Sequence, residues 1–495
     1  MTHTLGQLLD EAGLPDVSAA VRHTVITALE YDSRRVTPGA GFFAFPGAKA
    51  DGRQFVNDAY ARGAAAVFSE SAAPPGLPGL WIAVPHGRRA LALMSRCFYP
   101  AVLDLVLTGI TGTNGKTTTC YLIDEILRAA GHITGQVGTI EYHVAGETRK
   151  ALNTTPESVD LYRLFDELRR RGGSHATMEI SSHALALGRV WGMHFAVAVF
   201  TNLTQDHLDF HGTMEKYFGA KSELFAGQDA RPPHTAVLNQ DDPWAQRIAL
   251  SAETRPLWYG FGDGAALRAV NLEMGFAGLR FDVEWLGRRW PVQSGLAGRF
   301  NVYNILAAFG AGLAHGIGPE TICAAIAARR AVPGRFERID NGQPFLVVVD
   351  YSHTSDALRN AIQAARALTQ GRVITLFGCG GDRDRSKRPL MGQAAGELSD
   401  FVVLTSDNPR SENPLSIIND ALVGLRRTDV EHEIEPDRGK AIHRAVAEAR
   451  PGDVILLAGK GHEDYQVLQD RTIHFDDREV ARAALGALGF TGRAS

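Results

Sequence analysis

The stretch that most constrains this chain is LVLTGITGTNGKTTTCY, residues 105–121. An apolar run leads into the Gly-rich turn 111–115, and Lys116 and Thr117 then begin what reads as a helix. This order is typical of a phosphate-binding loop, where backbone N–H groups and a helix N-terminus surround phosphate oxygens. In such a loop the lysine reaches the β- and γ-phosphates of a nucleotide and the threonine hydroxyl binds Mg²⁺. The spacing is a variant, because Ile110 stands where the common motif has its first glycine.

Length and composition predict a multidomain globular protein. A chain of 495 residues is too long for one core and is expected to form roughly three domains. A net charge of −4 without a long basic run gives no support to a nucleic-acid or membrane-surface role. The four cysteines form no CxxC pair, which favours reduced thiols over disulfides or a zinc site. Without a signal-peptide pattern or an apolar run of about 18 residues, a cytoplasmic protein is expected.

The order of strand and helix signals predicts an α/β protein in three parts. Residues 1–104 read as a small α/β domain, and residues 105–334 as a central P-loop ATPase domain with a mainly parallel sheet. Within the central part, residues 256–292 alternate like antiparallel strands. Residues 335–495 form a second strand–helix series that resembles a doubly wound, Rossmann-like fold. Its first turn reads DYSHTSDAL rather than GxGxxG, so a dinucleotide cofactor is not supported.

Polar groups follow several predicted strands, where ligands bind in open α/β sheets. Glu179 ends the run HATME and is a candidate Mg²⁺ ligand, with a carboxylate that caps the next turn as the alternative. The segment 202–212, NLTQDHLDFHG, is unusually dense in groups that bind metals or transfer protons. Lys221 lies on the apolar face of a predicted helix, where snorkelling toward solvent is the ordinary explanation.

Two further clusters combine arginine with acidic side chains. FGCGGDRDRSKRPLM, residues 377–391, carries Arg383, which can bind a carboxylate bidentately. SDNPR follows another strand, and its Asp407 and Arg410 suit the opposite charges of an amino acid. A charged, solvated loop remains the alternative for both clusters.

Ten segments of the chain together resemble the Mur ligase family of peptidoglycan synthesis. In order they are TGTNGKTT, MEISSH, NLTQDHLDFHG, YFGAKSELF, GRFNVYN, PGRFER, DYSHTSDAL, FGCGGDRDRSKRPLM, DNPR and GKGHEDYQ. The resemblance runs from about Asp32 to Gln466. The DNPR form resembles the diaminopimelate-adding members, because lysine-adding relatives usually differ at the arginine.

The resemblance implies an ATP-dependent ligase that adds meso-2,6-diaminopimelate to the D-glutamyl γ-carboxylate of UDP-N-acetylmuramoyl-L-alanyl-D-glutamate through an acyl phosphate. It implies ATP as co-substrate, two Mg²⁺ ions, and CO₂ held as a carbamate on Lys221 (N6-carboxylysine). A carbamate is an anionic oxygen ligand suited to Mg²⁺, so the resemblance reverses the snorkelling interpretation. It also implies a cytoplasmic monomer that acts on small molecules, with no nucleic-acid or membrane partner.

The resemblance assigns site residues by motif position. Those implied for ATP are Gly112, Thr113, Asn114, Gly115, Lys116, Thr117, Thr118, Asn301, Asn304, Arg335 and Asp350, with His353 beside them. Those implied for the UDP-linked precursor are Ser33, Ala48, Lys49, Ala50, Asn153, Thr154, Thr155, Ser181, Leu187 and Arg189. Those implied for diaminopimelate are Arg383, Asp407, Asn408, Pro409, Arg410, Gly459 and Glu463. The implied metal ligands are Thr117, Glu179, His207 and carbamoylated Lys221, and the implied catalytic residues are Lys116, Lys221 and His207.

Three segments depart from the family pattern. The HQADG loop reads AKADG here, Leu187 replaces a glutamine, and DYAHTPDAL reads DYSHTSDAL. The first two weaken single substrate contacts and leave the reaction unchanged. His207, His211 and His353 stay open as acceptors of the amine proton. The alternatives in activity are a lysine-adding ligase, a folylpolyglutamate synthetase and, from another class, a nucleotide-dependent switch or binding protein.

Overall fold

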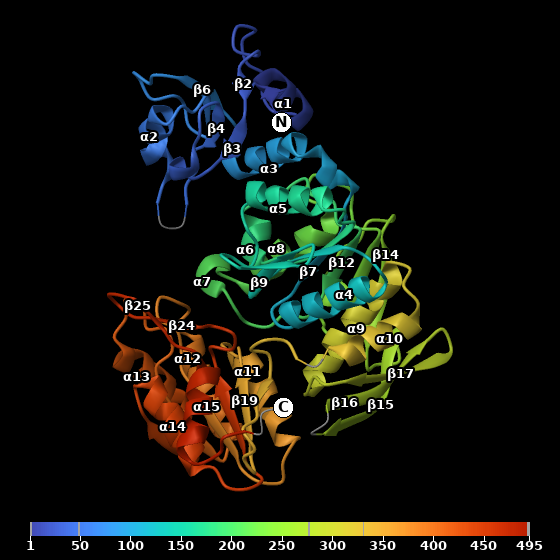
Figure 1. Cartoon of the computed structure of the whole chain (residues 1–495), viewed down its shortest axis with the longest axis vertical. Coiled ribbons are helices and arrows are strands. Elements are labelled where there is room, and N and C mark those ends of the chain that lie inside the picture. Colours follow the sequence, from blue (N-terminus) through green and yellow to red (C-terminus); the bar gives the residue numbers. More distant parts are fainter. Residues whose placement is uncertain (1, 48–49, 276–277, 330, 493–495) are drawn as a thin grey trace.

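The chain builds three α/β units one after another along the sequence (Figure 1). The computed structural model describes residues 2–47, 50–275, 278–329 and 331–492. The N-terminal unit runs from His3 to Asp104, the central unit from Val106 to Ala328 and the C-terminal unit from Glu337 to Ala487. The predicted α/β class is therefore confirmed. No helix in these described ranges is long and apolar enough to cross a membrane.

The N-terminal unit is a parallel sheet of four strands in the order β3-β4-β5-β6. Its first helix begins with a capping box, in which the side chains of Thr4 and Gln7 bond each other's backbone N–H, and Gly13 ends it in the left-handed conformation. The elements are β1 (His3–Thr4), α1 (Leu5–Ala12), β2 (Val25–Ile26), β3 (Ala28–Glu30), η1 (Ser33–Arg35), β4 (Ala40–Phe43), η2 (Gly52–Phe55), α2 (Val56–Ala61), β5 (Ala66–Ser69), β6 (Leu80–Ala83), α3 (Gly87–Phe98) and η3 (Pro100–Asp104).

The central unit holds a sheet of eleven strands in the order β10-β9-β8-β11-β7-β12-β13-β14-β15-β16-β17. Strands β8 to β15 of that order run parallel, and hairpins extend both edges. Its elements are β7 (Val106–Thr111), α4 (Lys116–Ala129), β8 (Thr134–Val137), β9 (Glu141–Val144), β10 (Glu147–Lys150), α5 (Ser158–Arg170), β11 (His175–Glu179), α6 (Ser182–Ala186), β12 (Val197–Phe200), α7 (Leu208–His211), α8 (Met214–Ala226), β13 (Thr235–Asn239), η4 (Ala245–Arg247), β14 (Arg255–Gly260), β15 (Leu267–Gly275), β16 (Gly278–Trp285), β17 (Arg288–Ser294), α9 (Arg299–Ala314) and α10 (Pro319–Ala328).

Helices cover both faces of the central sheet, as the apolar strands predict. In β12, Val197 and Val199 belong to the core that includes α4 and α9, whereas Ala198 and Phe200 belong to the core that includes α5 and α8. The expected antiparallel pairing of residues 256–292 is only partly right. Strand β14 pairs parallel with β13 and β15, and only β15, β16 and β17 are antiparallel. Alternation reports which faces are buried and says nothing about the direction of a neighbouring strand.

The C-terminal unit is a doubly wound sheet in the order β18-β19-β23-β20-β21-β22, parallel except for β18. Polar loops follow the carboxyl ends of β19, β20, β21 and β23, where such sheets bind ligands. The elements are β18 (Glu337–Ile339), β19 (Leu346–Asp350), α11 (Ser355–Arg366), β20 (Val373–Phe377), α12 (Lys387–Leu398), β21 (Phe401–Leu404), α13 (Pro414–Leu425), β22 (Glu431–Ile434), α14 (Arg438–Glu448), β23 (Val454–Ala458), β24 (Tyr465–Val467), β25 (Thr472–His474) and α15 (Asp477–Ala487).

Candidate active site

The predicted phosphate loop connects β7 to α4, and its two glycines are required by the backbone. Gly112 (φ 146°) and Gly115 (φ 87°) both have positive φ. A Cβ at Gly112 would overlap the Thr201 hydroxyl, and one at Gly115 would overlap the Asn304 amide. The loop therefore has the narrow, backbone-lined form that lets N–H groups approach phosphate oxygens.

Two lysine side chains meet under this loop. Lys116 Nζ donates to the carbonyls of Gly112 (2.9 Å) and Thr113 (2.8 Å), and Lys221 Nζ donates to the same Gly112 carbonyl (2.7 Å). Lys221 is 1% exposed, so the snorkelling interpretation is wrong. Burial, then the charge of Lys116, lowers the pKa of Lys221 well below its ordinary value. Its neutral amine, the form that reacts with CO₂, is thereby favoured.

Thr117 and Glu179 form an oxygen pair beside the loop. The Thr117 hydroxyl donates to Glu179 Oε2 (3.0 Å), and the parallel register sets Glu179 opposite Ile110, the next-to-last residue of β7. Thr139 donates to the same carboxylate from its backbone N–H (2.8 Å) and its hydroxyl (3.1 Å). Arg335 Nη2 donates to the Thr117 hydroxyl (3.0 Å). A hydroxyl and a buried carboxylate are hard oxygen donors, so this pair fits Mg²⁺.

A second charged group surrounds Asp206, which is 6% exposed. Its Oδ2 lies 3.4 Å from His207 Nε2 and 3.8 Å from His353 Nε2, and its Oδ1 lies 4.0 Å from Lys387 Nζ. Burial raises the pKa of Asp206, but the hydrogen bond and charge of the neighbouring His353 outweigh burial and hold that pKa well below its usual range. Burial lowers the pKa of His207 to about 3, so His207 is neutral, as a metal-ligating histidine must be. His211 instead contacts the Ser182 hydroxyl (2.9 Å).

The remaining residues expected at the nucleotide lie on α9 and around β19. Asn304 Nδ2 donates to Asn301 Oδ1 (2.9 Å), and Asn301 Nδ2 donates to the Ala297 carbonyl (2.7 Å), so only Asn304 adjoins the loop directly. Asp350 accepts the Phe336 backbone N–H (2.8 Å) and so fixes the segment that carries Arg335. Arg335 also covers the Tyr351 ring, 4.5 Å from its centroid.

The residues expected to hold the precursor peptide gather next to Glu179. The Thr155 hydroxyl donates to the Glu179 carbonyl (2.9 Å) and accepts from the Ser181 backbone N–H (3.1 Å). The hydroxyl of Thr154 lies 3.1 Å from that of Thr139, and the Asn153 carbonyl accepts from Tyr142 (2.6 Å). Arg189 Nη1 donates to the Thr155 carbonyl (3.0 Å), and Leu187 is the C-cap of α6.

The residues expected at the uridine end belong to the N-terminal unit. Ser33 is buried at the start of η1, and Ala50 is exposed in the loop after β4. Ala48 and Lys49 lie outside the described residues. Of the described residues, Ser33 and Ala50 thus belong to the N-terminal unit, whereas the precursor-peptide set belongs to the central unit.

A cluster of polar side chains lies at the carboxyl end of the C-terminal sheet. Asn408 Nδ2 donates to Glu463 Oε2 (2.8 Å), and the fully buried Lys460 donates to Glu463 (3.3 Å) and lies 3.6 Å from Asp407. Burial, then the charge of Asp407, raises the pKa of Glu463. Gly459 has φ 116°, and a Cβ there would be 2.8 Å from Asp407 Oδ2. Lys460 was not predicted as a site residue, although GKGHE marked its loop.

Two arginines lie in the loops next to this cluster. Arg410 Nη1 donates to the Gly381 carbonyl (2.7 Å). A Cβ on Gly380 would be 3.0 Å from Arg410 Nη1 and 3.8 Å from Arg383 Cγ, so both side chains meet at this glycine. Pro409 joins Asn408 to Arg410, which has φ 52°. The set combines two guanidinium groups with acidic and amide side chains, as recognition of an amino acid requires.

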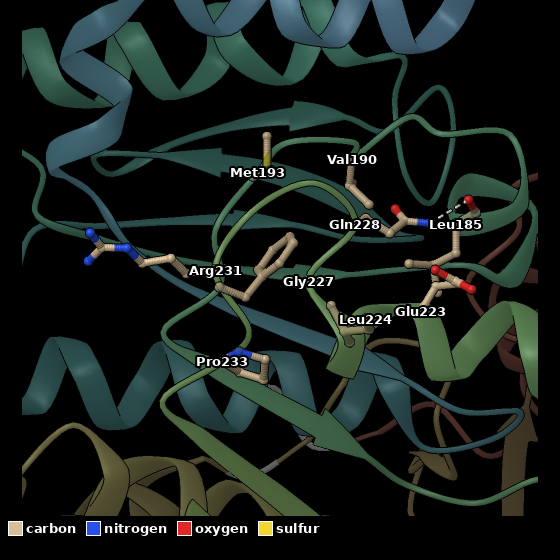
Figure 2. A pocket seen from close by; sticks show the side chains of 10 residues that line it. Leu185, Val190, Met193, Glu223, Leu224, Gly227, Gln228, Arg231 and Pro233 are labelled. Atoms are coloured by element: carbon tan, nitrogen blue, oxygen red, sulfur yellow. Dashed lines mark hydrogen bonds between the residues drawn. The ribbon is translucent and has the colours of Figure 1, made fainter. Parts of the chain in front are cut away.

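A small cavity lies beside α8 (Figure 2). It measures about 10 Å³, room for about one water molecule. The residues that line it are Leu185, Val190, Met193, Phe195, Glu223, Leu224, Gly227, Gln228, Arg231 and Pro233, none of them a predicted site residue. Within the described ranges, no group of three or more His, Cys, Asp or Glu side chains is arranged to hold a metal ion by itself.

A backbone-lined loop of the phosphate-binding kind, with a hydroxyl–carboxylate pair beside it and a charged cluster on the adjoining unit, fits an ATP-dependent ligase. The chain belongs to the Mur ligase family, as its resemblance predicts. Three family models match: the Mur ligase family catalytic domain at residues 25–99, the Mur ligase middle domain at 110–312 and the Mur ligase glutamate ligase domain at 334–461.

Relatives and solved structures agree with this family. The chain is 62% identical to the UDP-N-acetylmuramoyl-L-alanyl-D-glutamate--2,6-diaminopimelate ligase of Solibacter usitatus, over 98% of this chain and 99% of that protein. It is 46% identical to the ligase of the same name from Geobacillus thermodenitrificans, over 93% and 95%. A solved structure of a ligase with this name has a TM-score of 0.71 at 32% identity and covers 99% of this chain and 100% of that one. MurF of Thermotoga maritima in complex with ADP shares the fold, with a TM-score of 0.64 at 19% identity, over 87% and 93%.

Proposed function

We propose that this protein adds meso-2,6-diaminopimelate to the D-glutamyl γ-carboxylate of UDP-N-acetylmuramoyl-L-alanyl-D-glutamate, with ATP, in cytoplasmic synthesis of a peptidoglycan precursor. The choice of amino acid rests on one observation: Arg383 and Arg410 meet at Gly380, and the same end of the C-terminal sheet also carries Asp407 and Glu463. The far end of diaminopimelate bears both an ammonium and a carboxylate. Lysine lacks that carboxylate and would leave a guanidinium unpaired.

The three parts of the chain have separate tasks in this proposal. Residues 1–104 hold the uridine end, residues 105–334 bind ATP and the precursor peptide, and residues 335–495 bind the amino acid. All substrates are small molecules, and the protein acts as a monomer. The Asn114 amide already contacts Asp356 of the C-terminal unit (3.0 Å), which supports closure of that unit over the phosphate loop.

In the first step a γ-carboxylate oxygen of the precursor attacks the γ-phosphorus of ATP. The bond from that phosphorus to the β–γ bridging oxygen breaks, and an acyl phosphate and ADP result. Lys116 and the loop N–H groups stabilise the charge on the transferred group. Thr117 and Glu179 would hold one Mg²⁺, which supplies further charge neutralisation when bound.

His207 and Lys221 would hold a second ion only after carbamoylation. The neutral Lys221 amine attacks CO₂, a C–N bond forms, and one proton leaves the nitrogen. Burial in contact with Lys116 supports this step, because both effects favour the neutral amine. The carbamate product is anionic and would pair with the positive charge of Lys116.

In the second step the diaminopimelate amine attacks the acyl carbon. The bond from that carbon to the phosphate oxygen breaks, phosphate leaves, and the nitrogen loses one proton as the amide forms. The charged cluster of the C-terminal unit orients the far end of the amino acid. Closure of this unit excludes water, which would otherwise hydrolyse the acyl phosphate.

A purified-enzyme assay that counts ADP release with each amino acid tests the proposal. We expect turnover with diaminopimelate that needs the UDP-linked precursor, little turnover with lysine, and loss of ligation in Lys116→Ala. Lys216→Ala, which removes an exposed lysine from α8, is the matched control. Near-normal turnover of Lys116→Ala contradicts the mechanism. Lysine turnover would indicate the lysine-adding ligase, and ATP hydrolysis indifferent to any acceptor would indicate a nucleotide switch.

A further inference from the structure

One carboxylate joins arginines from two different units. Glu157, the N-cap of α5, accepts from Arg189 Nε (3.0 Å) and Arg88 Nε (3.3 Å) on the same atom, Oε1. Arg88 lies in the first turn of α3 in the N-terminal unit, and Arg189 follows α6 in the central unit. The Glu157 side chain is only 10% exposed, and its Oε2 is enclosed without a partner among the described residues.

The two guanidinium groups keep free donors at this junction. Arg88 Nη1 and Nη2 and Arg189 Nη2 donate to no residue that the structure describes. The two side chains retain 12% and 19% of their surface. With one carboxylate between two guanidinium groups, the trio has a net charge of +1. It therefore presents spare N–H groups and positive charge, the combination that binds phosphate.

The position of the trio indicates which anion it binds. Arg88 lies over the Phe45 ring, 4.3 Å from its centroid, and Phe45 precedes the loop expected to hold the uridine end. Arg189 donates to Thr155, within the set expected to hold the muramoyl peptide. The chemical group between uridine and the muramoyl sugar of a UDP-linked substrate is a diphosphate. The two peptide carboxylates are a poorer match, because both belong to the terminal glutamate, whose γ-carboxylate must reach the phosphate loop.

We propose that Arg88 is a further precursor-binding residue that, together with Arg189, binds the diphosphate of the UDP-linked substrate. Glu157 is a positioning residue that orients both guanidinium groups through Nε and leaves their Nη atoms for the phosphates. This inference rests on the proposed function for the identity of the substrate. That Arg88 and Arg189 lie side by side follows from their contacts with Glu157 alone.

Arg88→Met tests the proposal, because methionine keeps an apolar stem beside Phe45 and removes the donors. Arg96→Met is the matched control. Arg96 is on the same helix and also reaches the central unit, through Nη1 to the Gly192 carbonyl (3.5 Å), but it does not contact Glu157. Binding of UDP and of uridine to the full-length protein is measured by calorimetry, alongside kcat and KM for each substrate.

We expect Arg88→Met to weaken UDP binding by about 10- to 100-fold, as for the loss of charge-assisted hydrogen bonds, while uridine binding is unchanged. The KM for the precursor should rise by a similar factor, with kcat and the KM values for ATP and amino acid unchanged. Glu157→Ala should act in the same direction, and Glu157→Gln, which keeps an acceptor oxygen, should restore most of the affinity.

Unchanged UDP affinity in Arg88→Met, an equal loss for uridine, or an equal effect of Arg96→Met would overturn the proposal. The ligase activity and the role of Arg88 can be disproved independently of each other. Wild-type protein that binds UDP through Arg88 but does not ligate contradicts only the proposed function. Wild-type protein that ligates while Arg88→Met binds UDP normally contradicts only the role of Arg88.

Discussion

The contact between Asn114 and Asp356 links the phosphate loop to the C-terminal unit, and its removal should slow the use of the amino acid. The Asn114 side chain donates to Asp356 Oδ2 (3.0 Å) from the tip of the loop. The Asn114 backbone is held separately, because its N–H donates to Asn202 (2.9 Å) and its carbonyl accepts from Thr201 (2.6 Å). Substitution of Asp356 by alanine therefore removes the contact between units and leaves the loop backbone supported.

The size of the effect follows from the chemistry of this contact. A hydrogen bond to a charged group contributes about 1.5–3 kcal/mol. Since burial raises the pKa of Asp356, we expect the lower part of that range. Each 1.36 kcal/mol changes a rate constant tenfold, so Asp356→Ala should lower kcat/KM for diaminopimelate by roughly 10-fold and at most about 100-fold. ATP binding in the absence of amino acid should not change, because Lys116 and the loop glycines remain.

The assay is ADP release with diaminopimelate titrated at saturating ATP and precursor. Asn360→Ala is the matched control, because Asn360 donates to the same Asp356 oxygen (3.2 Å) from within α11 and does not join the units. The double variant Asn114→Ala/Asp356→Ala should be no slower than either single variant. Activity of Asp356→Ala within about twofold of wild type, or additive losses in the double variant, would refute the reasoning.

Two further predictions concern stability. Arg438 and Asp477 form an ion pair (2.6 Å) with both side chains 0% exposed, so Arg438→Met should destabilise the C-terminal unit by about 3–5 kcal/mol by leaving a buried charge. Chemical denaturation measures this loss of stability, and the double variant Arg438→Met/Asp477→Leu should recover most of it. Equal losses in the single and the double variant would show that the unpaired charge of Asp477 is not the cause. Burial, then neighbouring histidines, lowers the pKa of His175 and of His315 to about 4, against about 6.5 when unfolded. The unfolded chain then binds more protons, so stability should fall as pH drops from about 6.5 to about 4 and level off below. Urea midpoints measured across this range check the prediction. A His315→Gln variant whose stability depends on pH as steeply as that of the wild type would refute it.

Local chemistry explains why the phosphate loop was predictable from sequence. A strand, a Gly-rich turn and a helix start occupy contiguous residues, and Gly112 and Gly115 have the positive φ that such a turn needs. Alternating strands and helices likewise predict the α/β class, because burial patterns are set within single elements. The direction of β14 was not predictable, since its alternation is the same beside a parallel or an antiparallel neighbour.

The sequence by itself determined the family, the order of motifs and the residue types available for catalysis. Only the tertiary structure decided which of those groups meet. Arg88 and Glu157 are 69 residues apart, and Asn114 and Asp356 are 242 apart. Lys221 would occupy an apolar helix face whether its amine reached solvent or turned inward. Only the packing of the helix against the phosphate loop determines that the amine turns inward. Such contacts depend on how separate sheets are placed relative to one another, and the periodicity of one segment carries no information about that placement.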